Sequence, residues 1–184
     1  MSPSTDTREN RELASEMKVL VSPARAGQIL AWARQHLSPD PHAGGPAGDG
    51  YQITSLYFDT AQFDVFHRRL LARALSPTCQ IAYRRTALVA MTSFGPIRLT
   101  MDSGLRALGI TCIQFSNEFG APLLEDQIIL ELKFRYGMPA LFKYLLEEFA
   151  LTPVPFSKYR FAAAALGFVN AASDTEQISQ PQYA

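Results

Sequence analysis

Cysteine, histidine and tryptophan are scarce in this chain of 184 residues, which contains two, three and one of them. Cys79 and Cys112 are too few for a disulfide scaffold or a cysteine-rich metal site, and we expect both to be small core residues in strands. The three histidines lack the spacing of metal ligands, so we expect surface positions for His36, His42 and His67. These scarcities exclude a metal centre built on thiolates and imidazoles.

Net charge and long apolar runs are also missing. Lysine plus arginine and aspartate plus glutamate number 17 each, so no global field attracts nucleic acid, and any anion site must come from local clustering of cations. No stretch approaches the roughly 20 apolar residues that span a bilayer, and the first ten residues contain no apolar signal region. We therefore expect no nucleic-acid partner, no transmembrane segment and a cytoplasmic location.

Common catalytic motifs are absent as well. The sequence has no Gly-x-Ser-x-Gly nucleophile elbow, no Walker loop and no dinucleotide fingerprint. Residues 38–50 are rich in proline and glycine, but a predicted strand follows them, whereas a phosphate-binding loop of the usual type precedes a helix. We interpret this segment as a plain loop. The sequence therefore contains no motif that indicates a common hydrolase or oxidoreductase.

What the chain does contain is a set of strands in which charged and apolar side chains alternate. Because successive side chains of a strand point to opposite faces, Glu131 and Lys133 share one face and Leu130 and Leu132 the other. Such strands are typical of a sheet curved around a charged interior, which suits a polyanion and a metal ion, or of an ordinary sheet with one solvated face. The same alternation occurs for Glu16 and Lys18, and for Arg98, Thr100 and Asp102.

The remaining pattern predicts one α+β domain that is long enough for a hydrophobic core. Apolar residues at helical spacing predict helices that begin near Pro23 and Pro139, and Ser157 is a candidate cap of a last short helix. We expect a domain over residues 13–170, with disordered tails at 1–12 and 171–184. Strands are predicted at about 14–21, 51–58, 79–86, 96–102, 110–116 and 127–135.

Several short segments add a family resemblance because they occur in a consistent order from residue 13 to about 168. They are Glu-Met-Lys at 16–18, Ser-Leu-Tyr-Phe-Asp-Thr at 55–60, Tyr-Arg-Arg-Thr-Ala at 83–87, Ile-Arg-Leu-Thr-Met-Asp at 97–102, Leu-Glu-Leu-Lys at 130–133 and Phe-Ser-Lys-Tyr at 156–159. In this order the segments resemble motifs of the VTC domain, the catalytic module of polyphosphate polymerases.

The resemblance implies an antiparallel β-barrel that encloses a triphosphate tunnel lined with basic residues. It implies a polyphosphate polymerase-like phosphotransferase that uses ATP, triphosphate or polyphosphate, with Mn²⁺ or Mg²⁺ as the cofactor. On matching positions Glu131 would hold the metal, and Glu16 would complete the charged lining. The implied catalytic residues are Lys18, Arg85, Arg98 and Lys158, and the implied phosphate-binding residues are these four together with Lys133 and Ser157.

The chain departs from the family pattern between residues 60 and 78. The family continues there through an Arg-x-Lys-x-Arg-type strand and another Glu-x-Lys strand, and both supply cations to the tunnel. Here the only basic residues of this stretch are His67, Arg68, Arg69 and Arg73, and we interpret the arginines as solvated charges. We therefore predict a shortened domain with an incomplete barrel, whose open edges would have to be covered or paired and which a second copy of the chain could complete.

Three functional hypotheses follow from this departure. The first is a polyphosphate polymerase-like enzyme with a metal-bound nucleotide in the tunnel. The second is a non-catalytic module that retains phosphate or polyphosphate binding, and the third is a truncated relic. The missing strands favour the second and third hypotheses, while the presence of both Glu131 and Lys158 favours some ligand binding.

Overall fold

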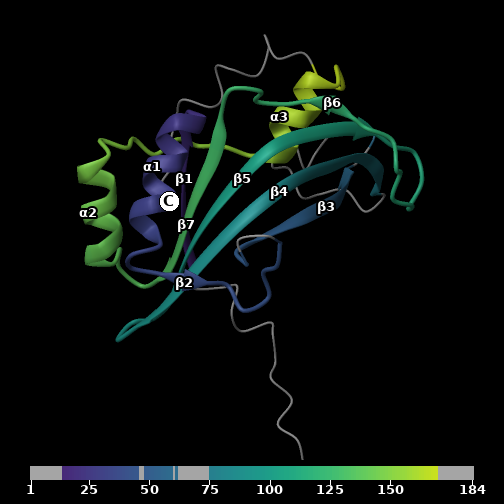
Figure 1. Cartoon of the computed structure of the whole chain (residues 1–184). Coiled ribbons are helices and arrows are strands. Elements are labelled where there is room, and N and C mark those ends of the chain that lie inside the picture. The colour runs from purple at the N-terminus through teal and green to yellow at the C-terminus, as the bar shows by residue number, and fades with distance from the viewer. Residues whose placement is uncertain (1–13, 46–47, 60, 62–74, 170–184) are drawn as a thin grey trace, which may run out of the picture. The chain divides into compact units, whose positions relative to one another are not determined.

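The computed structural model describes residues 14–45, 48–59, 61 and 75–169. Within these ranges the chain forms three helices and one antiparallel sheet of seven strands, so the predicted α+β class is confirmed (Figure 1). The elements are β1 (Ala14–Val21), α1 (Pro23–Ala33), β2 (Ser38–Pro39), β3 (Gly50–Asp59), β4 (Ser76–Thr92), β5 (Gly95–Gly109), β6 (Ala121–Pro122), β7 (Ile128–Arg135), α2 (Ala140–Glu148) and α3 (Lys158–Ala165).

The sheet is open in the described part of the chain. The strand order is β1-β7-β5-β4-β2, with β3 paired to β4 and β6 paired to β5, and no pairing joins the two ends of this order. A closed tunnel is thus not formed by these strands alone. Two parts of the sequence prediction lie outside the described residues. They are the two tails and the segment that departs from the family pattern, with His67, Arg68, Arg69 and Arg73.

The chain divides into two compact units. The first contains the described residues up to Gln52, Arg84–Ser103 and Asp126–Pro155. The second contains Ile53–Tyr83, Gly104–Glu125 and the described residues from Phe156 onward. The boundaries fall within β3, β4 and β5, so each of these strands contributes residues to both units.

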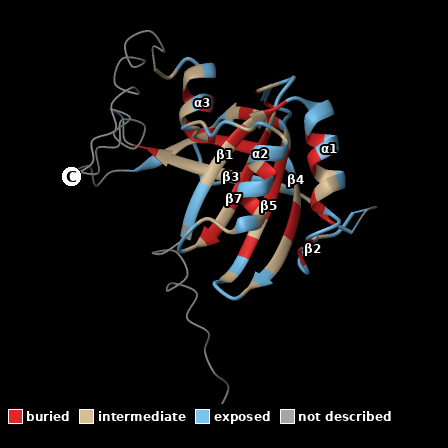
Figure 2. Cartoon of the chain, turned by 90° about the vertical axis from the view of Figure 1, so that its left-hand side faces the viewer, coloured by how far each residue is buried: buried red, intermediate tan, exposed pale blue. Residues whose placement is uncertain are grey.

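The core of the first unit lies between α1, α2 and one face of the strands. Helix α1 begins as predicted, because the Ser22 hydroxyl accepts a hydrogen bond from the Arg25 amide at 3.3 Å and Pro23 follows it. The helices contact one another through Trp32 of α1, whose ring centroid lies 6.0 Å from that of Tyr144. Figure 2 marks in red the buried residues, which include Val19, Ile29, Leu88, Leu99, Leu130, Leu132, Phe142 and Leu145.

The register of the strands places the charged residues on the face opposite this core. Glu16 and Lys18 of β1 lie opposite Lys133 and Glu131 of β7, and Arg98 of β5 lies opposite Lys133 from the other side. Because side chains alternate along a strand, these residues face away from the core residues between them. The alternation predicted from the sequence is therefore present in β1, β5 and β7.

The outer edge of β1 is partly covered by the segment that follows α2. The amide of Val154 donates a hydrogen bond of 2.8 Å to the carbonyl oxygen of Lys18. Val154 stands between Pro153 and Pro155, and proline has no amide hydrogen to donate. The two prolines therefore limit this contact of the sheet edge to a single amide within the stretch 153–155.

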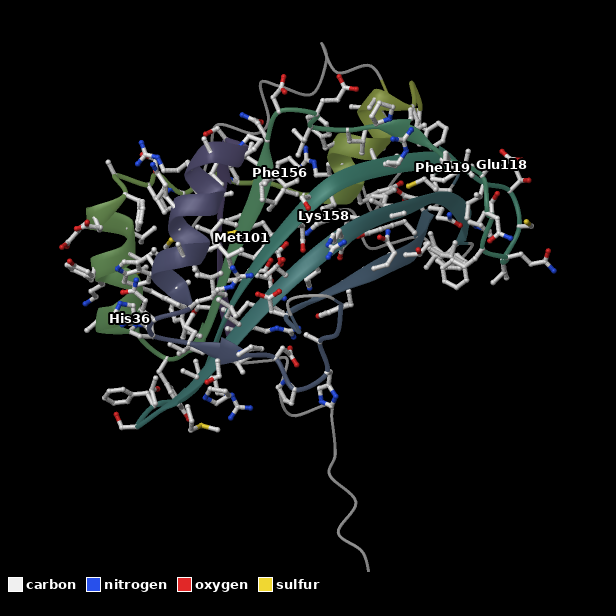
Figure 3. All side chains as sticks on the ribbon, in the orientation of Figure 1. His36, Met101, Glu118, Phe119, Phe156 and Lys158 are labelled. Atoms are coloured by element: carbon white, nitrogen blue, oxygen red, sulfur yellow. The ribbon has the colours of Figure 1, made fainter. Side chains whose placement is uncertain are left out.

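The predicted strand at 110–116 is wrong. Residues 110–120 have irregular backbone, and the short strand β6 pairs with β5 instead. The Gln80 side chain holds the segment, since its amide nitrogen donates to the Ser116 carbonyl at 2.9 Å and its oxygen accepts from the Ser116 amide at 2.8 Å. Ile113 and Phe115 are 72% and 62% exposed, so their alternation does not reflect a buried face. Figure 3 shows Glu118 and Phe119 in the same loop.

The two cysteines differ in their surroundings. Cys79 lies in β4 and is buried, as predicted, and burial raises the pKa of its thiol to about 12. Cys112 lies in the irregular segment and is exposed, so its predicted core position in a strand is wrong. His36 and His42 are exposed, as predicted.

Candidate functional site

Arg85 of β4 lies between two carboxylates of the first unit. Its Nε donates to Asp102 Oδ1 at 2.6 Å, and its Nη2 donates to Asp102 Oδ2 at 2.7 Å and to Glu131 Oε2 at 3.1 Å. The side chain of Arg85 is 12% exposed, and those of Asp102 and Glu131 are 0% and 3% exposed. A bidentate pair of this kind fixes the plane of the guanidinium. The chain itself therefore holds Arg85 in one orientation.

Glu131 is a buried carboxylate at the centre of the charged face. Its Oε2 accepts the contact from Arg85 and lies 3.5 Å from the donating Oγ1 of Thr100. In register it faces Lys18 of β1 on one side and Thr100 of β5 on the other. Buried charges require such partners, because the loss of solvation otherwise costs several kcal/mol, an order-of-magnitude value. The predicted metal ligand is thus already hydrogen-bonded within the chain.

Glu16 joins two lysines of the predicted phosphate-binding set. Its Oε1 lies 3.0 Å from Lys18 Nζ, and its Oε2 lies 3.1 Å from Lys133 Nζ. Burial raises the pKa of the Glu16 carboxyl, but the hydrogen bonds and charges of Lys18 and Lys133 outweigh this and lower the pKa below its ordinary value. All three side chains are partly exposed, so this cluster contributes little to stability.

Arg98 of β5 contacts residues from two other parts of the first unit. Its Nη2 lies 2.7 Å from Asp40 Oδ2 and donates to the Tyr51 hydroxyl, also at 2.7 Å. Its Nε is buried and has no hydrogen-bond partner. A pocket of about 250 Å³ lies beside Arg98, and Asp40, Lys133 and Arg135 also line it. Arg98 therefore faces a small pocket in which three of the lining residues are cationic.

Every predicted phosphate-binding cation of the first unit has a carboxylate partner. Four basic side chains meet four acidic ones, so the ion-paired group carries no net charge. Sequence reasoning missed Asp40, which lies in the loop before β3 and gives no local signal of its contact with Arg98. The pairs are Lys18 and Lys133 with Glu16, Arg85 with Asp102 and Glu131, and Arg98 with Asp40.

A metal ion has limited ligands on this face. Among the described residues there is no group of three or more histidine, cysteine, aspartate or glutamate side chains that could hold one. Glu131 and Asp102 are brought together by Arg85, and Mg²⁺ typically takes one or two carboxylates together with water and phosphate oxygens. The donor set fits a cation that arrives with a phosphate ligand rather than an all-protein site.

Ser157 and Lys158 belong to the second unit. Ser157 caps α3, as predicted, because its Oγ accepts a hydrogen bond of 3.4 Å from the Arg160 amide. Lys158, labelled in Figure 3, is the first residue of the helix. Its side chain is buried. Its Nζ lies 5.1 Å from the centroid of the Tyr83 ring, which is a cation–π distance. An aromatic ring therefore supports the ammonium group of Lys158.

A second buried contact of this unit joins α3 to β3. The Tyr159 hydroxyl donates to Asp59 Oδ2 at 2.5 Å, and both residues are buried. The Tyr57 ring stacks on that of Tyr159 with a centroid distance of 5.4 Å. Burial and the Asp59 carboxylate raise the pKa of the Tyr159 phenol. Sequence reasoning identified the Tyr-Phe-Asp-Thr motif but not this pairing.

We expect Tyr159→Phe to lower the free energy of unfolding by about 1–3 kcal/mol, because the buried Asp59 carboxylate loses a donor. The matched control is Tyr144→Phe, which removes an exposed hydroxyl from α2. Urea unfolding of both variants at pH 7 measures the difference, and equal stability of the two would contradict the expected role.

The same pair predicts a loss of stability in alkali. The folded-state pKa of Tyr159 is raised, so its contribution is complete below the unfolded pKa of about 10 and falls as the pH rises above that value. Tyr159→Phe should therefore lose less stability than the parent between pH 9 and 11, values set around that unfolded pKa. Urea unfolding across this range is the measurement.

The fold is that of an α+β domain with an open antiparallel sheet. In the first unit, helices cover one face of this sheet and charged residues occupy the other. The family model for the VTC domain matches residues 13–74 and 69–167, which is most of the chain. The chain therefore belongs to the VTC domain family, and the resemblance found in the sequence is confirmed. No curated protein matches the chain. Of the helices in the described ranges, none has the length and apolar character needed to cross a membrane.

Proposed function

We propose that the chain binds triphosphate-type anions, namely ATP, triphosphate or polyphosphate, together with Mn²⁺ or Mg²⁺. The observation that carries this proposal is the register of β1, β7 and β5, which aligns Lys18, Glu131 and Thr100 across one charged face. Membership of the VTC domain family supports a polyphosphate-related ligand. Lysine and arginine suit phosphate oxygens, and a carboxylate supplies the hard oxygen ligand of these metals.

The proposed roles follow the contacts of each residue. Glu131 holds the metal, which when bound adds positive charge and offsets the charge of the phosphate oxygens. Lys18 and Lys133 turn from Glu16 toward phosphate, and Arg98 presents its guanidinium beside the small pocket. On the family resemblance we assign phosphate contacts also to Arg85, Ser157 and Lys158.

A specific observation favours a second candidate, a phosphate-binding module without efficient turnover. The sheet is open in the described part of the chain, and the four predicted phosphate-binding cations of the first unit are matched by four carboxylates. Phosphoryl transfer requires a surplus of positive charge and exclusion of bulk water, since exposed ion pairs contribute little. Binding that depends on an added metal ion is compatible with this arrangement, whereas unaided catalysis is disfavoured.

Calorimetry with inorganic triphosphate, with and without Mn²⁺, tests the proposal without requiring turnover. We expect binding in the presence of Mn²⁺ and at least about tenfold weaker binding without it, because the ion-paired residues of the face carry no net charge of their own. The affinity should fall as salt is added. Absence of binding with Mn²⁺ at low salt would contradict the proposed function.

A matched pair of variants places the binding on the charged face. Lys18→Gln should weaken metal-dependent binding about tenfold or more. The reason is that it removes the Lys18 ammonium group, which lies beside Glu16 and is the proposed charge-assisted partner of a phosphate oxygen. Lys143→Gln removes an exposed cation from α2, outside the charged face, and should bind like the parent. Equal losses in both variants would indicate a general effect of charge rather than a site on this face.

A further inference from the structure

We infer that Arg85 is an internal counter-ion of Glu131 and that the divalent cation displaces it from this carboxylate. We infer further that Asp102 is a positioning residue, which retains the guanidinium when the metal arrives. This inference rests on the proposed function, because it assumes that a metal ion binds at Glu131. It adds an order of events and a role for Asp102.

The contacts of Arg85 are unequal. Two hydrogen bonds of 2.6 and 2.7 Å join it to Asp102, while one of 3.1 Å joins it to Glu131. The bidentate pair is the stronger of the two, because both donors act in parallel on one fully buried carboxylate. The contact with Glu131 is therefore the one that yields when a competing cation approaches.

Charge gives the reason for the exchange. Asp102 and Glu131 are two carboxylates in contact with the same guanidinium. A divalent cation on Glu131 would lie beside the positive Nη2 group, and like charges at such a distance repel strongly in a site of low exposure. Arg85 then gives up its contact with Glu131 while Nε and Nη2 both stay on Asp102.

A phosphate ligand provides the replacement partner. Once the contact with Glu131 is lost, a phosphate oxygen, which is a strong acceptor for guanidinium, can take the place of that carboxylate beside Nη2. The phosphate also supplies oxygen ligands to the metal, which Glu131 alone cannot saturate. Metal and phosphate should therefore bind cooperatively, and each should bind weakly without the other.

Titration with Mn²⁺ alone, followed by the electron paramagnetic resonance signal of the free ion, tests the competition directly. We expect Arg85→Gln to bind Mn²⁺ about tenfold more tightly than the parent, because the competing cation is gone. Arg84→Gln is the matched control, since it removes an exposed cation from the adjacent position of β4, and it should behave like the parent. With triphosphate present, Arg85→Gln should show less cooperativity than the parent.

The outcomes separate this inference from the proposed function. If Arg85→Gln binds Mn²⁺ no more tightly than the parent, while the parent still binds Mn²⁺ with triphosphate, the inference is overturned and the proposed function stands. If the parent does not bind Mn²⁺ even with triphosphate, both are overturned.

A second variant applies if Arg85→Gln fails to fold, which circular dichroism would show, since its two buried carboxylates lose their counter-ion. Asp102→Asn retains the shape of the side chain but leaves Glu131 as the main counter-charge of Arg85. We expect Mn²⁺ affinity in the presence of triphosphate to fall about tenfold or more, because the guanidinium stays on Glu131. Unchanged affinity in this variant overturns the role of Asp102.

Discussion

Glu131→Gln is expected to abolish metal-dependent binding of triphosphate. The substitution preserves the volume of the side chain and one oxygen acceptor, but it removes the charge that makes the carboxylate a ligand for Mg²⁺ or Mn²⁺. Affinity should fall about a hundredfold or more, since even indirect partners of a metal ligand contribute ten- to a hundredfold. Calorimetry at several metal concentrations measures the change.

The same variant should remain folded but less stable. Glu131 is buried and contacts Arg85 and Thr100, so its replacement weakens a charge-assisted hydrogen bond at a cost of about 1–3 kcal/mol. Glu147→Gln on the exposed side of α2 is the control and should match the parent in both binding and stability. Equal triphosphate binding by Glu131→Gln and the parent, at every metal concentration, would remove Glu131 from the proposed site.

Dilute protein is expected to produce no polyphosphate when supplied with ATP, Mn²⁺ and a polyphosphate primer. A polyanion requires cations in excess to offset the repulsion among neighbouring phosphates, and the four predicted phosphate-binding cations of the first unit are balanced by carboxylates. The strands in the described part of the chain form an open sheet, and contacts that stay in bulk water contribute little.

The assay is most informative over a wide range of protein concentrations. Chain growth that appears only as the protein associates would place the missing wall of the barrel in a second copy of the chain. Glu131→Gln at each concentration is the control for contaminating activity, because it lacks the proposed metal ligand. Robust chain growth by the monomeric protein would contradict the prediction.

The faces of the strands were predictable because alternation along a strand has a period of two. A shift by one residue would move Leu130 and Leu132 of β7 to the charged face and Glu131 into the core, so only one register is favourable. The segment 110–116 shows the limit of this rule. Its alternation resembles that of a strand, but Gln80 supplies its hydrogen bonds and its apolar side chains are exposed.

The cations of the candidate site were predictable from motifs, whereas most of their partners were not. Asp40 lies in a loop rich in proline and glycine, and nothing near it in the sequence indicates a contact with Arg98. Asp102 was placed on the correct face, but its bidentate contact with Arg85 depends on how β4 and β5 pair. Such contacts arise from tertiary structure, so local pattern alone does not specify them.

The prolines beside Val154 have a consequence for aggregation. An exposed strand edge offers unpaired amide and carbonyl groups to neighbouring chains, and proline obstructs this because it has no hydrogen to donate. Val154 donates to β1 at Lys18, while Pro153 and Pro155 prevent the segment from extending into a further strand that would present a new edge. The β1 edge is therefore covered at Lys18, and an intermolecular sheet that grew on this side would have to displace Val154.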